Sequence, residues 1–242
     1  IIKKFGEQTV LKGVSTRFEA GMTNLIIGQS GSGKTVFLKS LLGLHIPDSG
    51  TISFDGRIYS ELSNDEKRAL RTEIGMVFQG SALFDGMTVE ENIGFPLKMF
   101  SNKSPNEIKE RVDFVIDRVQ LVNAHHKRPS EISGGMQKRV AIARAIVNNP
   151  KYLFCDEPNS GLDPKTAIVI DNLIQEITAE YNITTVINTH DMNSVMGIGE
   201  HIIFLHNGQK WWEGTKEEII TSKNVELNEF IFASKFMKAL KK

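Results

Sequence analysis

The stretch Gly28-Gln29-Ser30-Gly31-Ser32-Gly33-Lys34-Thr35 decides the fold of this 242-residue chain. It follows the β-prone run Thr23 to Ile27, and it precedes apolar residues at helical spacing: Val36, Phe37, Leu38, Leu41 and Leu42. The pattern G-x-x-x-x-G-K-[ST] is complete, and it stands between a strand and a helix as a phosphate-binding loop requires. In such a loop, glycines let backbone N–H groups turn toward a phosphate, Lys34 reaches the β and γ phosphates, and Thr35 offers a hydroxyl to Mg²⁺. A chance glycine-rich turn is the alternative, and the flanking elements argue against it.

Two further β-prone runs deliver polar residues at their C-terminal ends. Lys151 to Cys155 is followed by Asp156-Glu157-Pro158, and Ile183 to Asn188 is followed by Thr189-His190-Asp191. Short apolar strands that alternate with helical segments, such as Thr166 to Tyr181, indicate a mostly parallel sheet covered by helices. Ligands of such sheets bind beyond the carboxyl ends of the strands, so we expect the site there.

The adjacent carboxylates Asp156 and Glu157 suit phosphoryl transfer to water. Asp156 emerges from an apolar strand, where it can hold the Mg²⁺ that Thr35 also serves, and Glu157 can orient a water molecule. Taken alone, the pair fits equally well an acidic turn that closes a strand before Pro158.

A second anion site is expected at Ser133-Gly134-Gly135, directly before the helical run Gln137 to Val147. One domain has no obvious need for two γ-phosphate sites, so we expect this one to serve the nucleotide of a second copy of the chain. A plain helix N-cap at Ser133 is the alternative.

Taken together, these motifs resemble those of the ABC ATPase family, over the whole length of the chain. The matching segments are the Walker A loop Gly28–Thr35, the Q-loop glutamine Gln79, the signature Ser133-Gly134-Gly135, the Walker B strand Tyr152–Asp156, the D-loop Ser160-Gly161-Leu162-Asp163 and the switch histidine His190. Phe5 falls where the family stacks an aromatic ring on adenine, although ordinary packing is a strong alternative for an isolated aromatic residue.

The resemblance implies ATP hydrolysis, with ATP and Mg²⁺ as cofactors. It implies catalytic roles for Lys34, Glu157 and His190, and metal contacts from Thr35, Gln79 and Asp156. The residues that it implies for ATP binding are Phe5, Gly28, Gln29, Ser30, Gly31, Ser32, Gly33, Lys34, Thr35, Gln79, Ser133, Gly134, Gly135 and Asp163.

The expected fold class is α/β: a P-loop NTPase (RecA-like), mostly parallel sheet with an antiparallel β layer and an inserted helical subdomain. The β layer is expected within Thr9 to Tyr59, with strands at Thr16–Phe18 and Thr51–Phe54 and a turn at Phe54-Asp55-Gly56-Arg57. We expect one ABC ATPase domain over 1–242, with its core in 1–80 and 148–242, the helical subdomain in 81–147, and a C-terminal helical tail over 226–242. Within the subdomain, Pro105 to Val122 and Gly135 to Val147 are predicted helices.

The signature departs from the usual L-S-G-G-Q, because Ile132 and Met136 replace its first and last residues and a polar contact expected from the glutamine is lost. Together with the segments Gly80 to Val89 and Gly33 to Val36, this variant is similar to the Mla/Mce-associated branch of the family. The branch implies phospholipid transport between bacterial membranes.

Composition and the family resemblance together suggest the partners. The 29 basic residues balance 29 acidic ones, so no nucleic-acid partner is expected. No apolar stretch approaches the roughly 20 residues needed to cross a bilayer, so the protein is expected to be soluble by itself. The resemblance implies a second copy of the chain and a separate membrane permease, and it suggests a periplasmic or membrane-anchored lipid-binding subunit and a small cytoplasmic regulator. We expect a cytoplasmic protein, peripheral on the cytoplasmic face of the inner membrane.

Two other functions compete with transport. A soluble ABC ATPase needs no membrane partner, but such proteins tend to carry tandem cassettes, coiled coils or zinc-binding cysteines, which this sequence lacks. A P-loop kinase or GTPase would have no use for the signature, and the guanine-reading N-K-x-D pattern is absent. The apolar face of the tail is expected to pack on its own domain, with docking on another subunit or an anionic membrane surface as the alternative. The single cysteine, Cys155, lies in an apolar run and is predicted to be buried.

Overall fold

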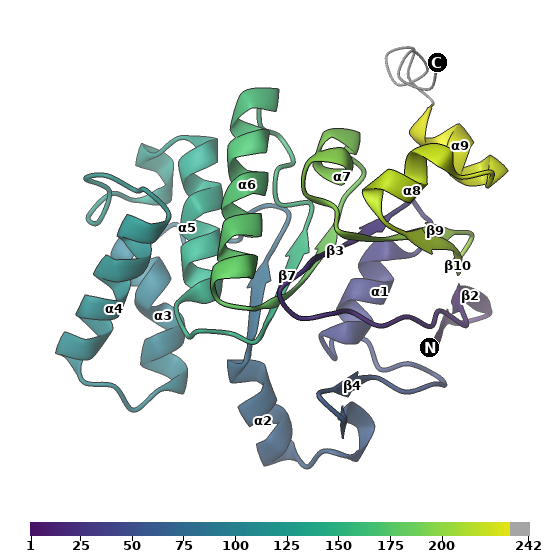
Figure 1. Ribbon diagram of the computed structural model, residues 1–242. Coiled ribbons are helices and arrows are strands. Elements are labelled where there is room, and N and C mark those ends of the chain that lie inside the picture. The colour runs from purple at the N-terminus through teal and green to yellow at the C-terminus, as the bar shows by residue number, and fades with distance from the viewer. Residues whose placement is uncertain (233–242) are drawn as a thin grey trace. The chain divides into compact units, whose positions relative to one another are not determined.

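The computed structural model describes residues 1–232, which form both helices and strands (Figure 1). The elements are β1 Ile2–Phe5, β2 Gln8–Lys12, β3 Thr23–Ile27, α1 Lys34–Leu41, β4 Ser53–Phe54, β5 Arg57–Ile58, η1 Tyr59–Glu61, α2 Asn64–Thr72, β6 Ile74–Val77, α3 Val89–Phe100, α4 Pro105–Arg118, η2 Pro129–Glu131, α5 Gly134–Ile146, β7 Tyr152–Asp156, α6 Pro164–Glu180, β8 Thr184–Asn188, α7 Met192–Ile198, β9 His201–His206, β10 Gln209–Gly214, α8 Lys216–Thr221 and α9 Val225–Ile231. They form two compact units. The first contains Ile1–Glu19, Thr23–Lys67 and the residues from Val186 onward, and the second contains Ala20–Met22 and Arg68–Thr185.

The first unit contains neighbouring strands in the order β10-β9-β3-β8. Strand β3 runs parallel to β9, with Ile26 opposite Ile203, and β10 pairs with β9 in the antiparallel direction. All five residues of β3 are buried. A strand that is covered on both faces needs a continuous apolar run rather than an alternating one, and Leu25-Ile26-Ile27 provides it.

The antiparallel β layer of the first unit differs in detail from the prediction. Two separate two-stranded ribbons are present, β1-β2 and β4-β5. The predicted strand at Thr16–Phe18 is wrong, because residues 13–19 pair with no strand, and Thr51–Phe54 is a strand only from Ser53. The predicted turn is confirmed: Asp55 and Gly56 both have positive φ, 50° and 81°, as a tight two-residue hairpin requires.

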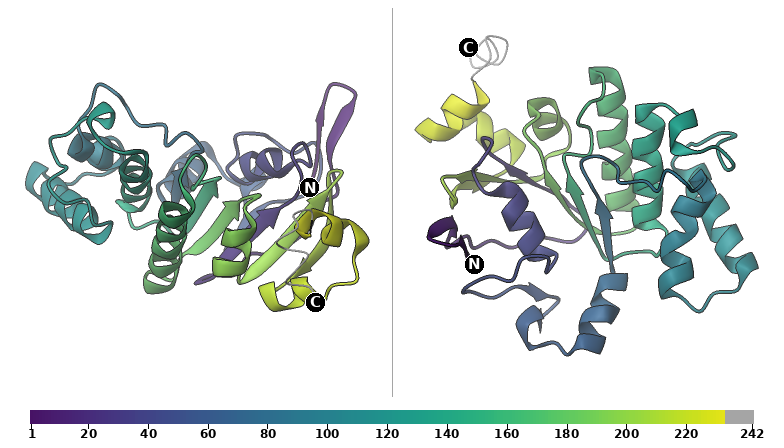
Figure 2. Two further views of the ribbon diagram at one scale, coloured as in Figure 1. Left: turned by 90° about the horizontal axis from the view of Figure 1, so that it is seen from above. Right: turned by 180° about the vertical axis from the view of Figure 1, so that it is seen from behind.

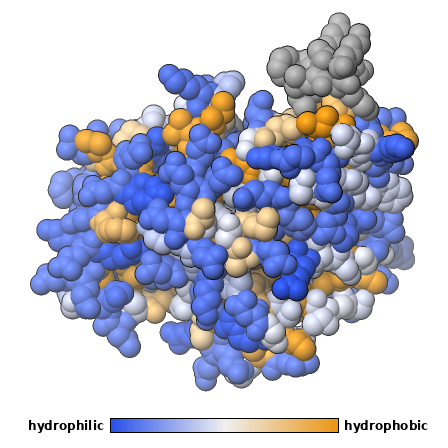
Figure 3. Space-filling model, in the orientation of Figure 1, coloured by the Kyte–Doolittle hydropathy of each residue, from blue (hydrophilic) through white to orange (hydrophobic). Residues whose placement is uncertain are grey.

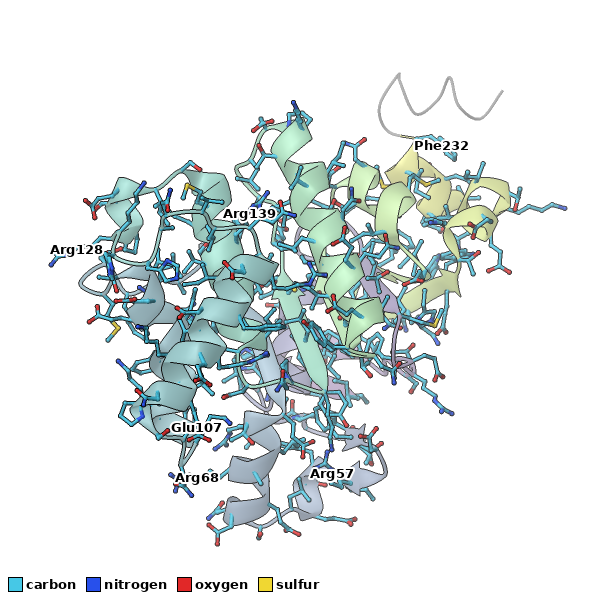
Figure 4. All side chains as sticks on the ribbon, turned by 60° about the vertical axis from the view of Figure 1, so that its left-hand side comes forward. Arg57, Arg68, Glu107, Arg128, Arg139 and Phe232 are labelled. Carbon is cyan, nitrogen blue, oxygen red and sulfur yellow. The ribbon has the colours of Figure 1, made fainter. Side chains whose placement is uncertain are left out.

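The second unit combines the parallel pair β6-β7 with a group of helices. Strand β6 has Val77 opposite Cys155 of β7. Helices α3, α4 and α5 pack against one another, and they lie side by side in Figure 1 and in the two views of Figure 2. Ser104 begins α4 with a reciprocal cap, in which Glu107, labelled in Figure 4, accepts from the Ser104 backbone N–H at 2.7 Å. Helix α4 ends at Arg118 rather than at the predicted Val122, because Gln120 takes a left-handed conformation (φ 57°) that stops a helix.

One buried amide organises the segment between β6 and α3. Asn92 of α3 is fully buried, and its side chain accepts from the backbone N–H of Phe84 at 2.8 Å. Its Nδ2 group donates to the carbonyl oxygens of Phe84, Met87 and Thr88 at 3.0–3.3 Å. A buried amide that is fully bonded to backbone groups holds a loop as strand pairing would. The segment 80–88 is therefore ordered without any regular structure.

The predicted domain division stays a prediction. The helices expected in 81–147 are present and α3 is a further one, but the two compact units divide the chain elsewhere, at Lys67 and Thr185. In the predicted tail, α9 buries Leu227 and Ile231, and residues 233–242 lie outside the described residues.

The surface is mixed rather than apolar. The face seen in Figure 3 is mostly hydrophilic, with scattered hydrophobic spots. No helix within residues 1–232 has both the length and the apolar character that a membrane crossing needs. Cys155 is fully buried as predicted, and burial raises the pKa of its thiol.

Candidate nucleotide site

The loop from Gly28 to Thr35 lies in the first unit, between β3 and α1, and its shape depends on glycine at three places. Gly28, Gly31 and Gly33 have φ values of 151°, 80° and 102°. A Cβ atom on Gly28 would lie 2.3 Å from the carbonyl oxygen of Leu205, so no side chain fits there. Gly33 is the N-cap of α1 and uses its left-handed conformation to turn the chain into the helix. Positive φ at these glycines is the kind of backbone in which successive amide groups can turn toward an anion.

Lys34 occupies the interior of this loop. The residue is 8 % exposed, and its ammonium group donates hydrogen bonds to the carbonyl oxygens of Gly28 at 2.8 Å and Gln29 at 3.0 Å. The side chains of Gln29, Ser30 and Thr35 are exposed at the rim. The Ser32 hydroxyl is buried and has no hydrogen-bond partner. A buried polar atom without a partner is rare, and here it marks a place where a ligand can supply one.

His190 belongs to the same unit as the loop. The backbone N–H of Thr189 donates to the carbonyl of Ile26 at 3.2 Å, which fixes the chain after β8 beside the end of β3. His190 follows Thr189 directly and is exposed. Asp191 then caps α7 by accepting from the N–H of Asn193 at 2.8 Å. The two strand ends that sequence analysis singled out in this unit therefore lie next to each other.

Phe5, the predicted adenine contact, ends β1 in the first unit. Its side chain is 45 % exposed and meets the His45 ring edge to face, with 5.3 Å between ring centroids. The ammonium of Lys3 lies 5.3 Å from the Phe5 ring centroid. An aromatic face left this exposed is available for stacking on a flat ligand, and its role stays a prediction.

The second unit holds the glutamine and the two carboxylates. Since Val77 lies opposite Cys155 in the β6-β7 pair, the two chains leave the sheet side by side, and Gln79 is brought to Glu157. The side-chain amide of Gln79 donates to a carboxylate oxygen of Glu157 at 3.1 Å. Asp156 is the last residue of β7 and is only partly buried. These three predicted site residues are therefore gathered by the register of one strand pair.

Glu157 has an unusual backbone conformation. Its φ of 48° is in the left-handed region, which costs a non-glycine residue about 1–2 kcal/mol. Strain of this kind persists where the surrounding structure enforces it, and it is common at functional sites.

The signature segment has the geometry of a helix start. Ser133 is the N-cap of α5, and its side-chain oxygen accepts a hydrogen bond from the backbone N–H of Met136 at 3.3 Å. Ser133 therefore does cap this helix, as the alternative interpretation expected. Its hydroxyl proton can still donate to a phosphate. A Cβ on Gly135 would lie 2.8 Å from the Thr166 methyl group, so this position is restricted to glycine by packing on α6.

Asp163, predicted to bind ATP through the D-loop, is engaged within its own helix. It caps α6 by accepting from the N–H groups of Lys165 and Thr166, both at 3.1 Å. The Thr166 hydroxyl donates to it at 2.5 Å, and this bond holds the pKa of the Asp163 carboxyl below its usual range. Its carboxylate is therefore ionised at neutral pH and bound to its own helix.

Sequence analysis missed Lys138 and Arg144, and it did not predict the contact between Gln79 and Ser160 of the D-loop. Lys138 donates to the Gln79 carbonyl at 2.5 Å, and the Ser160 hydroxyl donates to the same oxygen at 3.4 Å. Arg144 donates to the carbonyls of the two residues that follow Gly80. The one signal in the sequence was that Lys138 interrupts the buried face of a helical pattern, as a charge among Val140, Ala141 and Ile142.

Comparison with known proteins identifies the family. Residues 11–160 match the family model described as ABC transporter. A probable ribonucleotide transport ATP-binding protein of Mycobacterium leprae is 37% identical over 234 residues, which span 96% of this chain and 67% of that protein. The chloroplastic protein TRIGALACTOSYLDIACYLGLYCEROL 3 of Arabidopsis thaliana is 37% identical over 251 residues, 97% of this chain and 72% of its own. The chain belongs to the ABC transporter family, and it is an ATPase of that family.

Solved structures agree with the fold class. The ATP-binding cassette MJ0796, determined as a dimer in a post-hydrolysis state with ADP and Pi, has a TM-score of 0.79 and 34% sequence identity, and the match covers 89% of this chain and 95% of that one. The expected P-loop fold is confirmed: parallel strand pairs with an antiparallel layer and helices. The chain spans about two thirds of the length of the mycobacterial relatives, 67% and 64% in two of them.

Proposed function

We propose that this chain is the ATP-binding and ATP-hydrolysing subunit of a transporter whose membrane-spanning part is a separate polypeptide. The observation that carries the proposal is the loop of residues 28–35, where left-handed glycines lead into α1 and two loop carbonyls hold the buried ammonium of Lys34. Such a loop attracts the β and γ phosphates, because amide groups, the helix dipole and a lysine act at one point. The buried Ser32 hydroxyl has no hydrogen-bond partner within the protein, and a phosphate oxygen would supply one.

The residues proposed for Mg²⁺ are Thr35, Gln79 and Asp156, through a hydroxyl, an amide oxygen and a carboxylate. Within residues 1–232, no group of three or more His, Cys, Asp and Glu side chains could hold a metal ion by itself. Mg²⁺ in nucleotide sites uses one or two carboxylates and completes its shell with phosphate oxygens and water. The donor set therefore suits an ion that arrives with the nucleotide, where it would neutralise phosphate charge.

Hydrolysis is assigned to Glu157, with help from Gln79 and His190. Glu157 would accept a hydrogen bond from the attacking water, and His190 would donate to the γ phosphate. Gln79 already donates to Glu157 through its amide nitrogen, which leaves its amide oxygen available as a metal ligand. The Gln79 side chain can thus hold the Glu157 carboxylate and bind Mg²⁺ at the same time.

Two copies of the chain are proposed to enclose two ATP molecules, each between the phosphate loop of one copy and the signature of the other. Ser133 and its helix start have no assigned phosphate within their own copy, which supports a role in trans. The dimeric MJ0796 cassette supports the same arrangement by similarity.

A mixture of two inactive variants should recover activity. Ser133→Arg leaves the phosphate loop intact and Lys34→Ala leaves the signature intact, so their heterodimer has one complete site. With random pairing, half of the dimers are mixed and each has one of two sites, which gives about a quarter of the wild-type ATPase rate. The measurement is phosphate release from each variant alone and from the mixture. No recovery, with heterodimers demonstrated by two different tags, would contradict sharing of sites between copies.

The proposed cargo is a glycerophospholipid, moved between bacterial membranes. The support is the signature variant ending in Met136 and the similarity to a relative whose name contains a glycerolipid, whereas the mycobacterial relatives are named for ribonucleotide transport. The proposed partners are a permease, a periplasmic or membrane-anchored lipid-binding subunit and a small cytoplasmic regulator. The proposed location is the cytoplasmic face of the inner membrane.

The cargo is tested with the full chain copurified with its membrane partner and reconstituted into phospholipid vesicles. We expect Mg²⁺-ATP to drive movement of a fluorescent glycerophospholipid, and we expect no movement in the same complex that carries Glu157→Gln. A radiolabelled ribonucleotide serves as the competing cargo. ATP-dependent ribonucleotide uptake without lipid movement would contradict the lipid cargo and leave the ATPase assignment intact.

A further inference from the structure

Three basic side chains of α5 each bind backbone carbonyl groups, and two of them bind the same segment. Lys138 donates to the carbonyl of Gln79 at 2.5 Å. Arg144, two turns further on, donates to the carbonyls of Ser81 at 2.7 Å and Ala82 at 2.8 Å. Arg139, labelled in Figure 4, instead donates to the carbonyl of Val119, after α4, at 2.8 Å. Lys138 and Arg144 thus attach the segment after β6 to the helix that begins at the signature.

The attached segment would not hold its shape alone. Ser81 and Ala82 have φ values of 62° and 47°, and two successive left-handed residues without glycine are costly. Ser81 is 3 % exposed, so its backbone needs partners inside the protein. Arg144 supplies one, a donor to the Ser81 carbonyl, and it also donates to the Ala82 carbonyl, while Asn92 holds the far end at Phe84. The two residues with positive φ thus lie between Gln79, which Lys138 holds, and Phe84, which Asn92 holds.

Lys138 stands at the first of these points, in a costly position. It is 6 % exposed, and burial lowers the pKa of its ammonium, while the negative charge of Glu157 acts in the opposite direction. A buried ammonium is unfavourable unless nearby acceptors compensate it. Those acceptors are the Gln79 carbonyl and, at longer range, the Glu157 carboxylate. Lys138 therefore holds the backbone of Gln79, and the side-chain amide nitrogen of Gln79 donates to a carboxylate oxygen of Glu157 at 3.1 Å.

We infer that Lys138 is a positioning residue for ATP hydrolysis, which fixes the backbone of Gln79 so that its side-chain amide orients the Glu157 carboxylate. The inference rests on the proposed roles of Gln79 and Glu157. Lys138 lies on α5 five residues after Ser133, so a shift of the signature end of this helix moves the anchor of Gln79. The signature of a copy is thereby connected to that copy's own hydrolytic glutamate.

The central experiment replaces Lys138 by Met, a side chain of similar length without charge, in the full chain. The substitution removes the desolvation penalty of the ammonium but also takes a donor from the Gln79 carbonyl, so kcat is compared per folded molecule. Misplacing a catalytic group by a fraction of an ångström to 1 Å lowers the rate steeply, so we expect kcat to fall by about 10- to 100-fold. The KM for ATP should change by less than about twofold, because the phosphate loop is untouched. Lys138→Arg retains a donor for the carbonyl and should recover most of the lost turnover.

Arg111 provides a matched control. It is a half-buried cation of α4 whose pKa is also lowered by burial, and it donates to the carbonyls of Val147 at 2.9 Å and Ile146 at 3.2 Å, at the other end of α5. Arg111→Met should lower the melting temperature and leave kcat unchanged. If Lys138→Met instead loses stability while kcat per folded molecule stays at the wild-type value, Lys138 is only structural and the inference fails.

A second variant tests the route through Gln79. In a Gln79→Ala background there is no amide left to position, so adding Lys138→Met should change kcat by less than about twofold. An equally large fall in that background would mean that Lys138 acts on Glu157 without Gln79, which overturns the inference. These outcomes are read against a wild-type chain that hydrolyses ATP. If the wild type does not, the proposed function fails first, and the two failures are distinguishable.

Discussion

Replacing Lys34 by alanine is expected to abolish ATP turnover and to weaken ATP binding by at least about 100-fold. The ammonium of Lys34 is proposed to meet the β and γ phosphates, and hydrogen bonds to charged groups are worth about 1.5–3 kcal/mol each. Two such bonds account for a loss of this size. The same ammonium donates to the carbonyls of Gly28 and Gln29, so the substitution also removes what holds the loop from inside. Titration with a fluorescent ATP analogue and phosphate release measure the two effects.

The control for this variant is Lys39→Ala, in the last turn of the same helix. A lysine there interacts favourably with the helix dipole, and its loss should lower stability by only a few tenths of a kcal/mol. Nucleotide affinity should stay at the wild-type value. Unchanged affinity and turnover in Lys34→Ala would contradict the assignment of the phosphate loop.

Glu157→Gln is expected to separate ATP binding from hydrolysis. A general base contributes on the order of 10²–10⁴ in rate, and an amide cannot accept the proton of the attacking water. The amide has the shape of the carboxylate, and the phosphate loop and the signature are unchanged. ATP can therefore still bridge two copies, and the closed dimer should accumulate. Size-exclusion chromatography with Mg²⁺-ATP should show a nucleotide-dependent shift from monomer to dimer, together with a collapse of turnover.

A carboxylate outside the site gives the comparison for this variant. Glu176 of α6 is 62 % exposed at its side chain and pairs with Arg118 at 3.4 Å. Glu176→Gln should leave both turnover and the dimer shift as in the wild type, since exposed ion pairs contribute little. If Glu157→Gln hydrolyses ATP near the wild-type rate, Glu157 is only a turn residue, and His190 becomes the next candidate for the catalytic role.

The elements predicted well from sequence are those whose local chemistry leaves few choices. The β3-loop-α1 segment needs glycine where φ is positive, and the sequence has glycine at 28, 31 and 33. Strand β7 is a short apolar run that ends at Asp156, and β8 is a β-prone run that ends at Asn188, so each was predicted from its composition and from the polar residues that follow it. The contact between Gln79 and Glu157 was not predicted, because it depends on strand β6, which was not predicted, and on the register that places Val77 opposite Cys155.

The elements that escaped prediction depend on tertiary contacts. Helix α2 buries only Leu70, so its nine residues carry almost no apolar periodicity. Helix α3 contains Pro96, which normally argues against a helix interior. Thr16–Phe18 has β-like composition, yet no neighbouring strand accepts it, and Phe18 packs toward Phe37 instead. The β-like composition of Thr16–Phe18 therefore led to a wrong strand prediction in the β layer.

The roles of Lys138 and Arg144 were hidden for a different reason. In sequence they are basic residues of a helix that also carries Arg139, and basic residues of helices are mostly solvated. Only the folded second unit shows that their acceptors are carbonyl groups of residues about 60 positions earlier. The position of a backbone carbonyl in a loop is not encoded by the identity of its residue, so no motif could have shown these bonds.

The burial of Cys155 has a practical consequence for experiments on this protein. It is the only cysteine in the chain, it is fully shielded from solvent, and its thiol pKa is raised, so the reactive thiolate form is scarce in the native state. Alkylating and maleimide reagents should not react with Cys155 until the second unit opens. A cysteine introduced at any exposed position can then be labelled or cross-linked selectively in an otherwise unaltered background, and slow labelling of Cys155 itself reports how often β7 is uncovered.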